Sequence, residues 1–129
     1  VREAGVVVDK TGQPIFWHAP GDRTTVALPD NRTLWDALWD NRFIIQGVAH
    51  THPGSGIPGP SYTDVTTFAA IESSLGRRLD WWIASDDNLV VVRWVGADRL
   101  SYRGESINAE PVWLAELRQL SQYHQQQTK

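Results

Sequence analysis

The stretch His50-Thr51-His52-Pro53, followed after a short loop by Pro60-Ser61-Tyr62-Thr63-Asp64, decides how the rest of the chain is interpreted. The residues before it, 43–49, are mostly apolar and predict a buried strand that runs on to residue 52. Because side chains alternate along a strand, we expect His50 and His52 on the same face. Two neutral imidazoles and one carboxylate, here that of Asp64, form the ligand set typical of a catalytic zinc site, which keeps a fourth position open.

The second half of the stretch has the pattern of a helix start. Ser61 follows a proline, Asp64 lies three residues further on, and apolar residues recur at helical spacing as far as Leu75, with Gly76 as the expected end. Taken alone, Ser61 and Asp64 are explained by an N-cap and its acidic partner in a capping box. A capping box does not account for two histidines on one strand face, joined to this helix by the Gly/Pro-rich loop 54–59.

With these residues in place, the stretch resembles the JAMM motif of the MPN (JAB-domain) metalloproteases. That motif is His-Ser/Thr-His-Pro, a loop, and then Ser-x-x-Asp. Thr51 takes the Ser/Thr position and Pro53 follows the second histidine. Eight residues separate His52 from Ser61, one more than is usual in the family, and the extra residue falls in the loop 54–59, which can absorb it at little cost.

The resemblance implies a fold and a metal. The expected fold class is α/β (α+β mixed), with the MPN/JAB arrangement of a curved mixed β-sheet flanked by helices. The expected cofactor is Zn2+, held by His50, His52 and Asp64.

The resemblance also implies catalytic roles for two residues. Family members carry a glutamate on an early strand, followed closely by a glycine and an apolar run, and Glu3 before Gly5 matches this pattern. In the family this glutamate acts as general base and then as general acid, and Ser61 would donate a hydrogen bond to the oxyanion. Glu72 and Asp9 are rival candidates for the base, but neither occupies a motif position.

The implied function is that of a zinc-dependent peptidase or isopeptidase, a small bacterial-type member of the family. It would hydrolyse the bond after the C-terminal tail of a ubiquitin-like or sulfur-carrier protein, which is therefore the expected partner. Three alternatives remain open: a non-catalytic MPN scaffold or interaction domain, a RadC-like protein, and a cell-wall or phage-tail JAB-domain protein. The intact ligand set argues against the scaffold.

Length and composition set further limits. At 129 residues the chain is expected to form a single JAMM/MPN metalloprotease domain, residues 1–129. A net charge of −3 gives no indication of a nucleic-acid partner, and the absence of cysteine excludes disulfides and a thiol nucleophile. Because the sequence shows no membrane-length apolar run and no signal peptide, we expect no membrane partner and a cytoplasmic location.

The remaining segments predict alternating strands and helices. The expected strands are residues 5–9, 13–18, 24–28, 79–84 and 89–94, and the expected helices are residues 33–42, capped by Asn31, and a last helix that opens at Pro111. Within helix 33–42, Trp35 and Trp39 lie one turn apart. A buried helix face is the favoured interpretation of this pair, and a docking patch for a partner is the alternative.

Overall fold

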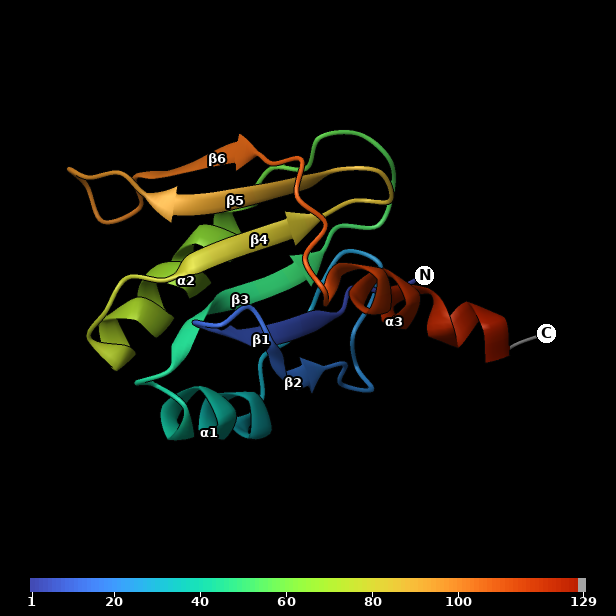
Figure 1. Ribbon diagram of the computed structural model, residues 1–129, viewed down its shortest axis with the longest axis horizontal. Coiled ribbons are helices and arrows are strands. Elements are labelled where there is room, and N and C mark those ends of the chain that lie inside the picture. The colour runs from blue at the N-terminus through green and yellow to red at the C-terminus, as the bar shows by residue number, and fades with distance from the viewer. Residues whose placement is uncertain (128–129) are drawn as a thin grey trace.

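The computed structural model, which describes residues 1–127, places the apolar run before His50 in strand β3 (Ile45–Thr51), inside a six-stranded sheet (Figure 1). The strand order is β2-β1-β3-β4-β5-β6. The other strands are β1 (Gly5–Asp9), β2 (Pro14–His18), β4 (Asp80–Ala84), β5 (Leu89–Trp94) and β6 (Tyr102–Ser106). Strands β3 and β4 pair in parallel and the other neighbours pair antiparallel, so the expected mixed α/β class is confirmed.

In the described part of the chain, three helices cover the two faces of this sheet: α1 (Arg32–Asp40), α2 (Tyr62–Leu75) and α3 (Leu114–Gln127). Helix α3 packs through Leu114 and Leu117 on one face, while α1 and α2 pack on the other face through Leu38 and Phe68, among others. Successive strand residues therefore serve different cores, which explains why the central strands read as continuous apolar runs. Helix α2 is the crossover between the parallel strands β3 and β4, so the helix that carries Asp64 begins close to the end of the strand that carries His50.

The capping residues expected for α1 and α2 lie at the ends of these helices. The Asn31 side chain accepts a hydrogen bond from the Leu34 N–H at 2.8 Å, which makes Asn31 the N-cap of α1. Gly76 ends α2 with a φ of 70°, a left-handed conformation that glycine adopts without the usual steric cost. Helix α3 begins later than expected, at Leu114, after a turn in which the Leu114 N–H donates to the Pro111 carbonyl.

One predicted strand is absent, and one strand was not predicted. Residues 24–28 form no strand, because the Thr24 N–H turns back to the Ala27 carbonyl and closes a local turn. Strand β6 was missed because its side chains are mostly exposed and polar, so it lacks the apolar alternation by which a half-buried strand is recognised. Strand β6 forms by antiparallel pairing with β5, which its own sequence does not indicate.

The two tryptophans of α1 have different environments. Trp35 is half-buried against the core, whereas the Trp39 side chain is 52% exposed and is covered on one ring face by the Arg42 guanidinium at 3.9 Å. The prediction of a buried face is therefore wrong for Trp39. Within residues 1–127, no helix combines the length and the apolar character needed to cross a membrane.

Candidate metal centre

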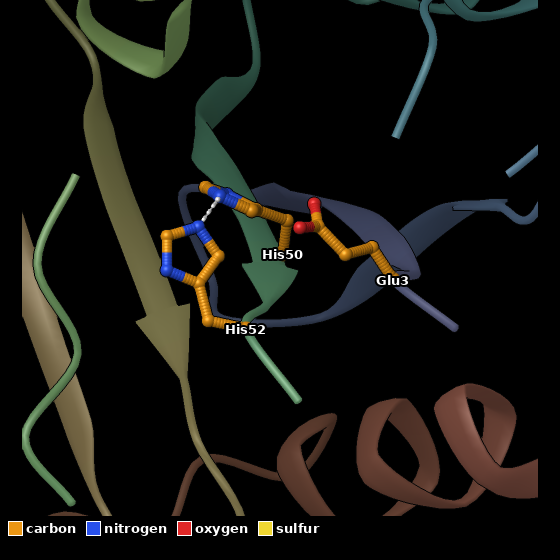
Figure 2. A group of neighbouring side chains, drawn as sticks. All are labelled: Glu3, His50 and His52. Atoms are coloured by element: carbon orange, nitrogen blue, oxygen red, sulfur yellow. Dashed lines mark hydrogen bonds between the residues drawn. The ribbon is translucent and has the colours of Figure 1, made fainter. Parts of the chain in front are cut away.

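The two histidines of the motif come together at the carboxyl end of β3. His50 is the second-last residue of the strand and lies between Gly5 of β1 and Ile83 of β4. His52 lies one residue beyond the strand, and its N–H donates to the Ala84 carbonyl at 2.9 Å, which extends the sheet pairing. The two rings lie on the same side, with their Nε2 atoms 3.1 Å apart (Figure 2).

Asp64 reaches this pair from the first turn of α2. Its Oδ2 atom lies 3.4 Å from Nε2 of His50 and 3.0 Å from Nε2 of His52. The same oxygen accepts a hydrogen bond from the Ser61 N–H at 2.9 Å, and the Ser61 Oγ accepts one from the Asp64 N–H at 3.0 Å. The capping box of α2 therefore fixes the carboxylate in front of the histidines.

The spacing of these three atoms suits a tetrahedral zinc ion. With zinc–nitrogen and zinc–oxygen bonds of about 2.0–2.2 Å, two tetrahedral ligands lie about 3.3 Å apart. The separations among Nε2 of His50, Nε2 of His52 and Oδ2 of Asp64 are 3.1, 3.4 and 3.0 Å. Three protein ligands leave a fourth position open, which is the arrangement of a catalytic rather than a structural zinc site.

Glu3 lies beside this cluster, two residues before β1 begins. Its carboxylate belongs with His50 and His52 to a group whose ligand atoms lie within 4.8 Å of one another, and Figure 2 shows it facing the His50 ring. Glu3 could thus compete with Asp64 as the third ligand. We favour Asp64, because its Oδ2 atom lies close to the tetrahedral separation from both histidine nitrogens.

The backbone on either side of Glu3 is held in place by hydrogen bonds to two parts of the chain. The Glu3 N–H donates to the Thr24 carbonyl at 2.8 Å, and Nη1 of the buried Arg23 donates to the Glu3 carbonyl at 3.3 Å. Next along the chain, the Ala4 N–H donates to Oγ1 of Thr51 at 2.9 Å, and the Thr51 N–H donates to the Ala4 carbonyl at 2.9 Å. Since Thr51 stands between the two histidines, these bonds fix Glu3 in register with them.

The pKa values of the two carboxyl groups in the cluster are shifted in opposite directions. Burial raises the pKa of Glu3, and the neighbouring His50 and His52 offset this only in part. Burial would also raise the pKa of Asp64, but hydrogen bonds from the same two histidines outweigh it and hold that pKa well below its usual range. The pKa of His52 is raised, chiefly by its hydrogen bond to Asp64. Asp64 is thus suited to remain an ionised ligand, and Glu3 to exchange a proton.

The other two acidic candidates for the base have structural roles. Glu72 is buried, and its carboxylate accepts hydrogen bonds from the Leu79 N–H, the Trp81 indole, Arg78 and the Tyr102 hydroxyl. Asp9 caps an exposed turn, where its Oδ1 accepts from the N–H groups of Thr11 and Gln13. Neither residue lines the cavity at the ligand cluster.

Sequence reasoning did not identify the residues that support the site. Ser121 of α3 donates to the Arg2 carbonyl and accepts a hydrogen bond from the Thr51 hydroxyl at 3.2 Å. Arg23 joins the Glu3 carbonyl to the Leu120 carbonyl, at 3.3 Å from each. Thr51 occupies a motif position in the sequence. Arg23 and Ser121 belong to no motif, and only their contacts with distant segments connect them to the site.

No family model matches the chain, and no curated protein matches its sequence. The resemblance to the MPN metalloproteases therefore depends on the motif residues and on the geometry described above.

Proposed function

We propose that the protein is a zinc-dependent metallopeptidase of the JAMM type with an MPN/JAB fold. It would hydrolyse a peptide or isopeptide bond after the C-terminal tail of a ubiquitin-like or sulfur-carrier protein. The observation that carries this proposal is the convergence of His50, His52 and Asp64 at tetrahedral spacing, with the buried Glu3 carboxyl beside them. The mixed sheet with helices on both faces is compatible with that fold.

In this proposal His50, His52 and Asp64 hold the zinc ion. When bound, zinc would supply Lewis-acid chemistry, which activates water and polarises a carbonyl. The ligand side chains come from the end of a central strand and from the first turn of a helix, so rigid elements position them.

Glu3 is the proton carrier. A carboxyl group with a raised pKa is closer to the operating pH than an ordinary glutamate, which favours both uptake and return of a proton. Glu3 would take a proton from the attacking water and deliver it to the leaving amine, so that one residue serves both steps. Its anchored backbone keeps the carboxylate near the reacting atoms.

Ser61 is the candidate oxyanion donor. Its Oγ accepts the Asp64 N–H, and among the described backbone and side-chain groups none accepts the hydrogen of its hydroxyl. Ser61 also lines the cavity that contains Glu3, His50 and Asp64. The hydroxyl is therefore free to donate to a negatively charged oxygen that develops in this cavity.

The proposal is tested with fusions in which a ubiquitin-like protein is joined through its C-terminal tail to a reporter. We expect cleavage at the end of the tail, loss of cleavage after zinc is removed with a chelator, and recovery when zinc is added back. A His50→Ala variant treated in the same way should stay inactive after zinc is returned. Cleavage that continues in the presence of the chelator would rule out the proposal.

A further inference from the structure

The ligand cluster opens into a cavity of about 430 Å³ that extends well beyond the ligands. Glu3, His50, Ser61 and Asp64 are among its polar lining residues. Much of the remaining lining is apolar and comes from the sheet, from α1 and α2, and from residues 24–30, which we call the strap. The apolar lining side chains include Val26, Leu28, Leu34, Val48, Phe68 and Ile71.

The strap is fixed over the sheet by hydrogen bonds at both ends. At its start, the Thr24 carbonyl accepts the Glu3 N–H at 2.8 Å. Near its end, the Pro29 carbonyl lies 2.7 Å from Nε2 of the buried His18, and since a carbonyl can only accept, this nitrogen carries the proton. The apolar wall of the cavity is thus joined directly to the backbone of the proposed general base.

The floor of the cavity lacks a side chain at the position next to His50. Gly5 of β1 pairs with His18 on one side and with His50 on the other. A Cβ atom on Gly5 would lie 3.2 Å from Cδ2 of Leu28 and 3.3 Å from the Ala49 carbonyl oxygen, so a larger residue there would push the strap away. The glycine therefore lets the strap lie close to the sheet and leaves the cavity continuous with the ligand cluster.

We infer that this cavity binds a bulky apolar side chain of the substrate tail, at about the third residue from the scissile bond. A sphere of 430 Å³ is about 9 Å across, and an extended chain advances about 3.3 Å per residue. In the proposed function the residues at the bond itself lie beside the ligand cluster and are small, and the first large side chain of the tail then reaches the apolar part. This inference rests on the proposed function, which places the scissile bond at the ligand cluster.

The size of the expected effect follows from burial. Transfer of a leucine or phenylalanine side chain from water into an apolar site strengthens binding by about ten- to a hundredfold. An aspartate at the same position would lose this gain and would also leave its charge without a partner in the apolar lining.

The test uses short peptides that end in Gly-Gly with a free carboxylate, preceded by Leu, Phe, Ala or Asp. These peptides are products of the proposed reaction, so their binding to the zinc-loaded protein can be measured by calorimetry without turnover. We expect the Leu and Phe peptides to bind about ten- to a hundredfold more tightly than the Ala and Asp peptides. Equal affinities across the set, or a preference for Asp, would overturn the inference.

Three variants locate the preference in the cavity. Val26 lines the cavity and Val112 does not, and both are strongly exposed, at 85% and 69%, so Val26→Asp and Val112→Asp should both fold. Val26→Asp and the cavity-filling Ala27→Trp should remove the preference, and Val112→Asp should keep it. The inference is wrong if Val26→Asp and Ala27→Trp bind all peptides as the unchanged protein does.

The two proposals can fail separately. If the fusions are not hydrolysed but the peptides still bind with an apolar preference, the proposed hydrolase activity fails and the apolar site stands. If the fusions are hydrolysed and the peptides show no preference, only the apolar site fails.

Discussion

The backbone N–H of Ser61 donates to Oδ2 of Asp64 at 2.9 Å, and this oxygen is also the one that lies 3.0 Å from Nε2 of His52. The capping box and the candidate ligand are therefore not alternative interpretations of Ser61 and Asp64. The cap holds the carboxylate in the orientation that a metal site requires, so that folding the first turn of α2 also prepares the site.

This double role predicts that Ser61→Ala lowers turnover far more than it lowers stability. Loss of the N-cap should cost about 1 kcal/mol of unfolding free energy. Loss of an oxyanion donor should lower kcat by about 10²–10³-fold. Both quantities can be measured on the same purified variant, by thermal unfolding and by cleavage of a fusion substrate.

Asn31→Ala provides the matched control for Ser61→Ala. Asn31 caps α1 in the same way, through its side chain and the Leu34 N–H, and does not line the cavity. It should show a similar drop in melting temperature with nearly unchanged turnover. If Ser61→Ala behaves like Asn31→Ala in both measurements, Ser61 has only the capping role.

The local elements of the site were predictable because their signals lie close together in the sequence. The apolar run before His50 predicts the strand, and Ser61, Asp64 and Gly76 mark the two ends of α2 with groups that satisfy free backbone atoms. Alternation along the strand predicts that His50 and His52 share a face, and the 3.1 Å separation of their Nε2 atoms agrees with this.

The cavity and its supports were not predictable, because they depend on contacts between distant segments. Residues 24–28 of the strap were expected to form a strand, and the sequence gives no indication that His18 and Glu3 hold the strap over Gly5. The position of Glu3 beside the histidines depends on the pairing of β1 with β3, which sequence reasoning supplied only through the family resemblance.

Zinc content should depend on His52. We expect about one zinc per chain in the unchanged protein and a large loss in His52→Ala, because two ligands hold a zinc ion far less tightly than three. Metal analysis after gel filtration measures this. His18→Gln is the control: His18 is a buried histidine outside the ligand set, and the glutamine amide can still donate to the Pro29 carbonyl. Equal zinc in His52→Ala and the unchanged protein would refute the ligand assignment.

Glu3→Gln should separate metal binding from catalysis. The substitution keeps the size of the side chain and removes its ability to carry a proton, so zinc content should stay the same and turnover should fall by about 10²–10⁴-fold. Glu105→Gln, at an exposed position on β6, controls for the loss of one negative charge. Loss of zinc in Glu3→Gln would make Glu3 a ligand, and full activity would place the base elsewhere.

The last prediction concerns the buried hydrogen-bond network around Glu72, which ties strand β6 to helix α2. The Tyr102 hydroxyl donates to the Glu72 carboxylate, and burial together with this bond raises the pKa of Tyr102. A folded-state pKa above the unfolded value of about 10 means that the unfolded chain loses its proton first. The stabilising contribution of the Tyr102–Glu72 hydrogen bond is therefore complete below about pH 10 and declines as the pH rises further.

Tyr102→Phe should lower the unfolding free energy by about 1–3 kcal/mol at neutral pH, because the buried Glu72 loses a donor. It should also weaken the loss of stability above pH 10, whereas Tyr62→Phe, at a 75% exposed position, should leave both properties unchanged. Denaturant unfolding at pH 7, 9, 10 and 11 measures both effects, and an alkaline loss of stability that is as steep in Tyr102→Phe as in the unchanged protein would show that another group causes it.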